Sequence, residues 1–232
     1  MGNILNYLYP DRCPACRRVM EAGEEQIHPG CREKFRRIKG PRCFKCGKTL
    51  FDVENNICPE CRNKKHTYVY GLPLFEYNET ARTAMLDFKK NGHRRNGDFF
   101  ASEYVKNLGQ TLKKLAPEVL IPVPVSDKKL RKRGFNQAEY LAERIGEALD
   151  IPVDATYLKR FGDTEQKELS GKERAKNALK SFELAGEPTE KRVCLVDDVY
   201  TTGSTIEGCT RVLKAAGVKE VGFITVFYDS IT

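Results

Sequence analysis

Two different patterns of apolar residues divide the chain. From residue 67 onward, short apolar runs alternate with segments in which apolar residues recur every three or four positions. The short runs predict strands and the periodic segments predict helices. The N-terminal part shows neither pattern and is instead polar and rich in cysteine. We therefore predict two domains, a small one at 1–66 and a larger one at 67–232.

In the larger domain the predicted strands and helices follow one another in turn. Strands are expected at 67–77, 119–125, 153–158, 192–198 and 220–228. Helices are expected at 79–90, 99–115, 136–149 and 204–216, with a short basic helix that ends near residue 180. Strands separated by helices predict an α/β fold, with a doubly wound, mostly parallel sheet. Ligands of such sheets bind at the carboxyl ends of the strands.

Seven of the nine cysteines belong to an internal repeat. Residues 12–34 and 42–64 match at an offset of 30 without a gap, and each copy reads C-x2-C-x11-[HC]-x2-C. Thiolates and imidazoles at this spacing are typical of structural, tetrahedral Zn²⁺ sites, and disulfides are disfavoured inside cells. The predicted ligand sets are Cys13, Cys16, His28 and Cys31, and Cys43, Cys46, Cys58 and Cys61. A crossed pairing, first with third and second with fourth, satisfies the same spacing.

The positive charge is concentrated in the same N-terminal region. Residues 1–70 contain 14 Lys/Arg against 8 Asp/Glu, whereas the rest of the chain contains 26 against 24. In the basic segment 32–48, Phe35 and Phe44 lie between the cations, a pattern that suits single-stranded nucleic acid. Two alternatives fit equally well: a solvated basic surface, and phenylalanines that pack in the metal-bound core.

The chain contains no apolar run near the ~20 residues that a membrane helix needs. Its first residues, MGNILNYLYPDRC, lack the basic segment and the long apolar core of a secretory signal. We expect a cytoplasmic protein with no membrane insertion.

The stretch LVDDVYTTGST, residues 195–205, carries the clearest chemical pattern of the larger domain. Asp197 and Asp198 end a predicted strand, and two adjacent carboxylates suit a diol or a hydrated Mg²⁺. The loop that opens the next helix, Thr201, Thr202, Gly203, Ser204 and Thr205, offers backbone amides and hydroxyls to a phosphate. The pattern predicts a ribose 5-phosphate site. The P-loop and dinucleotide fingerprints are absent from the sequence, and an Asx-type cap would explain only one aspartate.

The same stretch resembles the phosphoribosyl-pyrophosphate (PRPP) signature of type I phosphoribosyltransferases. Residues 121–142, IPVPVSDKKLRKRGFNQAEYLA, resemble the first strand and pyrophosphate loop of the ComF branch, and residues 166–182 resemble its mobile loop. With the cysteine-rich module, the resemblance to the ComF family of competence and DNA-uptake proteins spans nearly the whole chain. One departure is His28, where family members often carry cysteine.

The resemblance implies a PRPP site that works with Mg²⁺. Asp197 and Asp198 would hold the ribose hydroxyls, residues 201–205 the 5′-phosphate, and Val125 and Ser126 the pyrophosphate. Further candidate cations are Arg174 and the basic run 128–134, for which a solvated surface role is the alternative. A mobile loop at 160–175 would close over the site.

Two functions follow from this interpretation. The first is an enzyme that transfers a phosphoribosyl group from PRPP to an unknown acceptor, with Asp197, Asp198 and Arg174 as catalytic residues. The second is a non-catalytic, PRPP-sensing and DNA-binding scaffold. The expected partners are PRPP, single-stranded nucleic acid and a helicase-type protein of DNA uptake. The sequence identifies no general base, and His66 and His93 have no assigned role.

Overall fold

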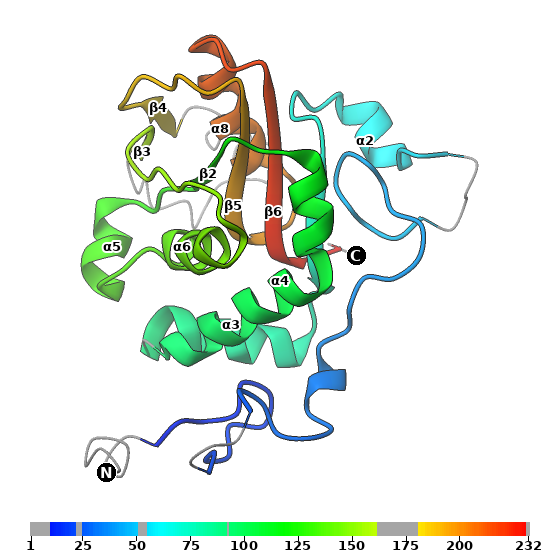
Figure 1. The fold of residues 1–232 in the computed structure, drawn as a ribbon, viewed down its shortest axis with the longest axis vertical. Coiled ribbons are helices and arrows are strands. Elements are labelled where there is room, and N and C mark those ends of the chain that lie inside the picture. Colours follow the sequence, from blue (N-terminus) through cyan, green and yellow to red (C-terminus); the bar gives the residue numbers. More distant parts are fainter. Residues whose placement is uncertain (1–9, 22–24, 51–54, 92, 162–180, 231–232) are drawn as a thin grey trace, which may run out of the picture.

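The computed structural model describes residues 10–21, 25–50, 55–91, 93–161 and 181–230 (Figure 1). Among these residues, four strands form one parallel sheet in the order β1-β6-β5-β2. They are β1 (Gly71–Glu76), β2 (Val119–Pro122), β5 (Arg192–Tyr200) and β6 (Glu220–Tyr228). The central strands β5 and β6 are almost continuous runs of buried residues, as expected for a parallel sheet that is covered on both faces.

Helices cover both faces of this sheet. The helices α3 (Glu79–Asn91), α4 (Arg94–Leu115) and α6 (Gln137–Leu149) contribute to one hydrophobic cluster, and α8 (Ser204–Ala215) contributes to the other. Asn136 caps α6, as predicted, because its side-chain oxygen accepts a hydrogen bond from the amide of Ala138 at 3.1 Å. The doubly wound, mostly parallel α/β fold is confirmed.

The local predictions differ from the structure at several places. The strand predicted at 67–77 begins at Gly71, and the strand predicted at 119–125 ends at Pro122. The strand predicted at 153–158 is wrong: Val153 makes a single bridge to Leu120, and β3 (Leu158–Arg160) begins at the end of that range and pairs antiparallel with β4 (Phe182–Leu184). The helix predicted to begin at residue 99 begins at Arg94. The basic run after Ser126 forms a short helix that was not predicted, α5 (Asp127–Arg133). The basic helix predicted to end near residue 180 lies outside the described residues.

The N-terminal repeat packs on the larger domain at two separate places (Figure 1). The first copy, with the 3-10 helix η1 (Arg32–Lys34), lies against α3 and α4, where Arg17 forms an ion pair with Asp87 at 3.0 Å. The second copy, with α2 (Pro59–Lys64), lies beside β1, where the amide of Gly71 donates to the carbonyl of Phe44 at 3.1 Å. Buried residues of the first copy belong to one hydrophobic cluster of the larger domain, and those of the second copy belong to the other.

The segment between the two copies covers an edge of the sheet. The amide of Ile38 donates to the carbonyl of Leu74 at 3.0 Å, and the amide of Glu76 donates to the carbonyl of Arg36 at 2.8 Å. An uncovered edge strand is a template for unwanted pairing with other chains. The linker thus protects β1 and joins the N-terminal repeat to the sheet.

Phe35, one of the two phenylalanines of the basic segment, is part of this junction. Its side chain is 3% exposed, and its ring lies 5.2 to 6.3 Å from the rings of Phe75, Phe99, Phe100 and Phe227. Base stacking on Phe35 is therefore wrong, and the core-packing alternative holds for this residue. Phe44 is 54% exposed and is available to a partner.

Within the described part of the chain, every helix is too short or too polar to cross a membrane.

Candidate functional site

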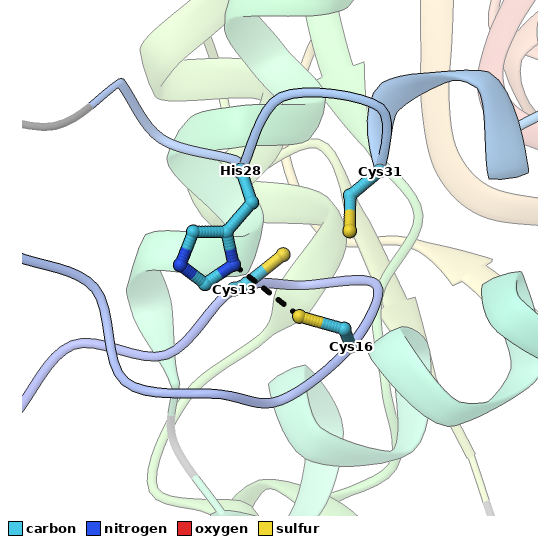
Figure 2. A group of neighbouring side chains, drawn as sticks. All are labelled: Cys13, Cys16, His28 and Cys31. Carbon is cyan, nitrogen blue, oxygen red and sulfur yellow. Dashed lines mark hydrogen bonds between the residues drawn. The ribbon is translucent and has the colours of Figure 1, made fainter.

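The first metal site is assembled from two turns of the first repeat copy. The side chains of Cys13, Cys16, His28 and Cys31 point toward a common centre (Figure 2), and one ligand atom of each lies within 4.8 Å of the others. His28 Nδ1 and Cys16 Sγ are 3.3 Å apart. Burial opposes ionisation of Cys16, but hydrogen bonds with Arg18 and His28 lower the pKa of its thiol to about 6. The thiolate form of Cys16 is thus favoured at neutral pH, whereas burial raises the pKa of the Cys31 thiol to about 11.

The second site repeats this construction with four buried thiols. Cys43, Cys46, Cys58 and Cys61 meet the same 4.8 Å limit. The amide of Cys58 donates to Cys43 Sγ at 3.3 Å, a contact that stabilises a thiolate. The ligands of each repeat copy therefore converge on their own site, so the sequential pairing holds and the crossed pairing does not. Both ligand sets, thiolates with or without one imidazole, fit structural Zn²⁺.

Packing explains one of the differences between the two zinc turns. Arg17 and the equivalent residue of the second copy, Gly47, both have positive φ, 62° and 76°. A Cβ on Gly47 would lie 2.1 Å from Pro73 Cδ of β1, whereas the first turn carries an arginine that pairs with Asp87. The second turn lies so close to the sheet that only glycine fits.

A pocket of about 250 Å³ opens at the carboxyl ends of β5 and β2, where parallel sheets bind their ligands. Asp197 and Asp198 of β5 line it, together with Val125 after β2 and Thr205 at the start of α8. Four cations from three elements line it as well: Lys89 of α3, Lys129 and Arg133 of α5, and Arg160 of β3. The pocket thus contains the predicted acid pair within a cationic wall.

The two aspartates have different environments. Lys89 of α3 forms an ion pair with Asp198, and both side chains are largely buried. Asp197 Oδ1 accepts a hydrogen bond from the amide of Asp198 at 2.8 Å. Burial, and then the neighbouring charge of Asp198, raise the pKa of Asp197 to about 7. At neutral pH, a ligand that donates hydrogen bonds or brings a cation therefore determines whether Asp197 is ionised.

The loop after β5 has a defined conformation. Gly203 has a φ of +79° and stands directly before α8, where no other residue type fits without strain. The hydroxyls of Thr202 and Ser204 are 2.9 Å apart. Thr201 and Thr202 are exposed, and Ser204 and Thr205 are partly exposed. The loop presents hydroxyls and the amide end of a helix next to the acid pair, a combination that suits an anion.

The second zinc ribbon contacts this loop and the helix that follows it. Lys64 of α2 donates to the carbonyl of Thr202 at 3.3 Å. Glu207 of α8 accepts hydrogen bonds from the amide and the hydroxyl of Thr67, at 2.9 and 3.0 Å. The hydroxyls of Tyr68 and Tyr200 are 2.8 Å apart beneath the loop. The candidate phosphate loop therefore rests on the residues that follow α2.

The structure also locates the other residues predicted from the sequence. Ser126 is 3% exposed beside the pocket, and its Oγ has no hydrogen-bond partner among the described residues. Arg174 and residues 162–175 of the predicted mobile loop lie outside the described residues. His66 stacks on Tyr68 at 4.7 Å and lies 3.6 Å from Glu207, so it belongs to the junction below the loop. His93 is exposed before α4.

The sequence indicates no individual role for Lys89, or for Arg160, which the structure places in β3 rather than in the mobile loop predicted to begin at residue 160. Lys89 ends a helical pattern like any solvent-exposed lysine, and Arg160 stands at the start of a polar stretch. Both residues reach the pocket because α3 and β3 pack near the end of β5, and a local sequence pattern does not show this packing.

Comparison with known proteins agrees with this architecture. Residues 4–63 match the double zinc ribbon domain, and residues 130–232 match the phosphoribosyl transferase domain. Fold and site therefore define a class of protein in which a double zinc ribbon precedes a phosphoribosyl transferase domain.

Full-length relatives narrow this class. Competence protein F of Haemophilus influenzae is 30% identical over 95% of this chain and 96% of its own length. Competence protein ComFC of Streptococcus pneumoniae is 31% identical over 82% of each chain. DNA utilization protein YhgH of Escherichia coli O157:H7 is 31% identical over 45% of this chain and 47% of its own length. The chain belongs to the family of competence protein F and ComFC.

Proposed function

We propose that this protein binds PRPP together with Mg²⁺ and transfers its phosphoribosyl group to an acceptor during DNA uptake. The observation that carries the proposal is the pocket at the end of β5, which Asp197, Asp198 and Thr205 line together with four cations. A sugar that carries both hydroxyls and phosphates matches this mixture of acids, hydroxyl donors and cations.

Each part of the pocket has a task in this proposal. Asp197 and Asp198 accept hydrogen bonds from the ribose hydroxyls. The hydroxyls and amides of residues 201–205 bind the 5′-phosphate at the start of α8. Val125 and Ser126 meet the pyrophosphate, where the buried Ser126 hydroxyl would find the partner that it lacks among the described residues. When the sugar binds, a ribose hydroxyl competes with Lys89 for Asp198.

The reaction is a displacement at the anomeric carbon. The acceptor forms a bond to this carbon, the bond to pyrophosphate breaks, and pyrophosphate leaves with the electron pair. Lys129 and Arg133 of α5 line the pocket and stabilise the negative charge that grows on the leaving group. Mg²⁺, which two adjacent carboxylates and a diphosphate suit, would neutralise the same charge when bound. Catalysis in this proposal is electrostatic rather than covalent.

One observation favours a second candidate, a PRPP-binding scaffold without turnover. Within the described residues, the pocket lining contains no histidine that could act as general base. Incubating the protein with PRPP, Mg²⁺ and candidate acceptors, with detection of pyrophosphate and of modified acceptor by mass spectrometry, separates the two. Release of pyrophosphate in the presence of an acceptor supports the enzyme. Saturable binding of PRPP without release supports the scaffold.

Contact with single-stranded nucleic acid is the second part of the proposal. The linker between the zinc ribbons exposes Arg36, Arg37 and Lys39, and Phe44 follows with an exposed ring. We expect the affinity for single-stranded DNA to fall steeply as salt rises, because such binding releases counterions. An affinity that does not change with salt would remove DNA from the proposal. A helicase-type protein of the uptake machinery is the further partner proposed from the family resemblance.

A further inference from the structure

Arg160 is the last residue of β3 and lines the pocket that contains Asp197 and Asp198. Its backbone is fixed by the strand pair, because Arg160 is opposite Phe182 of β4 and the next amide, that of Phe161, donates to the carbonyl of Ser181 at 2.9 Å. The strand β4 packs in turn on α8, the helix that begins with the candidate phosphate loop. Arg160 therefore reaches the pocket from a hydrogen-bonded strand pair that packs on the helix after the loop.

The guanidinium of Arg160 is also oriented. Its Cζ lies 5.2 Å from the centroid of the Phe182 ring, a cation–π contact with a ring that is itself buried. A planar guanidinium that is held on a ring directs its N–H groups along fixed lines, which is the arrangement used to recognise phosphate.

One donor of this group lacks a partner. Arg160 Nε is buried, and it has no hydrogen-bond acceptor among the residues that the structure describes. Other cations of the same pocket are engaged: Lys89 is paired with Asp198, and Arg133 donates to Gln137 Oε1 at 2.6 Å. A buried N–H without an acceptor is costly and uncommon in folded proteins. The position of Arg160 in the pocket indicates that a ligand supplies the acceptor.

We propose that Arg160 is a ligand-binding residue of this pocket and donates to a phosphate oxygen of the bound sugar phosphate. The proposal rests on the proposed function, and it identifies a phosphate contact that the sequence motifs leave out. The acceptor is either the pyrophosphate or the 5′-phosphate, which share the same chemistry.

The test compares Arg160→Met with Lys159→Met by titration calorimetry against PRPP, pyrophosphate and ribose 5-phosphate, each with Mg²⁺. Lys159 is the matched control, because it is the preceding residue of the same strand, carries the same charge and is exposed. We expect Arg160→Met to weaken PRPP binding by about 10- to 100-fold, the range of a hydrogen bond to a charged group. Lys159→Met should stay within about twofold, since exposed charges contribute little.

The other ligands identify the phosphate. A loss for pyrophosphate alone assigns Arg160 to the leaving group, and a loss for ribose 5-phosphate alone assigns it to the 5′-phosphate. Arg160→Lys, which retains the charge but not the planar donor group, should recover only part of the affinity. Thermal melts of each variant check that it folds, and Arg160→Gln replaces Arg160→Met if that variant does not fold.

Two results overturn the assignment: wild-type affinity for all three ligands in a folded Arg160→Met or Arg160→Gln, or full recovery in Arg160→Lys. Failure of the proposed function is a different result, in which the wild-type protein does not bind PRPP. If the wild type binds pyrophosphate alone and Arg160→Met loses it, the PRPP proposal fails and Arg160 remains an anion-binding residue. If the wild type binds none of the three, both fail.

Discussion

Replacing Gly203 by alanine tests how the candidate phosphate loop is supported. An added Cβ would lie 2.5 Å from Tyr200 Oη and 3.0 Å from Tyr200 Cζ. The tyrosine cannot move aside easily: it is 5% exposed, it stacks on Phe223 and Tyr228 at 4.9 and 5.4 Å, and its hydroxyl is bonded to that of Tyr68. Gly203→Ala should therefore destabilise the protein through both backbone strain and overpacking.

The expected loss in free energy of unfolding is the sum of the backbone strain and the overpacking. A non-glycine residue at a φ of +79° costs about 1–2 kcal/mol, and overpacking a filled site costs about 1–3 kcal/mol. We expect the free energy of unfolding to fall by about 3 kcal/mol. Gly40→Ala is the matched control, because its φ of +77° is nearly the same and nothing lies within 4 Å of the added Cβ. Gly40→Ala should lower the free energy of unfolding only by the backbone strain of about 1–2 kcal/mol.

A double-mutant cycle with Tyr200→Phe separates the terms. Removing the hydroxyl relieves the closest contact, so Gly203→Ala should cost about 1 kcal/mol less in the Tyr200→Phe background than in the wild type. Urea denaturation of the four proteins gives the numbers. An equal cost in both backgrounds, or a cost no larger than that of Gly40→Ala, would refute the steric account of the loop.

Three further predictions concern titration and metal. The raised pKa of Asp197 means that its contribution to stability is present below about pH 4 and is lost as the pH rises through about 7. The stability of Asp197→Asn should not show this loss. The affinity of the wild type for PRPP should increase with pH up to about pH 7, because Asp197 ionises over this range. Identical pH profiles of stability and affinity in the wild type and in Asp197→Asn would contradict this prediction. Burial opposes ionisation of Glu207, but hydrogen bonds from His66, Thr67 and Arg211 lower its pKa to about 2. The contribution of Glu207 to stability is thus present above about pH 4.5 and is lost as the pH falls toward 2. The variant Glu207→Ala lacks this contribution, so its free energy of unfolding at pH 7, measured by urea denaturation, should be lower by about 2 kcal/mol. A difference below about 0.5 kcal/mol would show that the contacts of Glu207 with His66, Thr67 and Arg211 contribute little to stability. Chelation of zinc should lower the melting temperature, because the ligands contribute to the cores of the larger domain; an unchanged melting temperature after complete loss of zinc counts against a structural role.

The zinc repeat could be predicted residue by residue because its information is local. Each ligand pair lies within one turn, and the offset of 30 aligns His28 with Cys58. The positions of the acid pair in a strand and of the loop 201–205 at the start of a helix could be predicted for the same reason, because these features are consecutive in the chain. That they bind a phosphoribosyl group stays a prediction. The surroundings of these residues could not be predicted in this way.

Residues whose environment depends on distant segments were missed or misread. Phe35 was a candidate for base stacking because its neighbours in sequence are basic, but its neighbours in space are rings from β1, α4 and β6. Val153 was predicted to lie in a strand, but within the described residues it forms one isolated bridge, to Leu120 of β2. Lys89 and Arg160 approach the acid pair only when α3 and β3 pack around the end of β5.

Calorimetric titration of PRPP with Mg²⁺ into the wild-type protein and into Asp197→Asn/Asp198→Asn tests the central claim most directly. The wild type should bind with a single saturable site, and at about 100-fold its dissociation constant PRPP should stabilise the protein by about 2.7 kcal/mol. The folded double variant should show neither the binding heat nor the stabilisation. Equal binding by both proteins, or no binding by the wild type, would contradict the assignment of the acid pair at the end of β5 to a phosphoribosyl site.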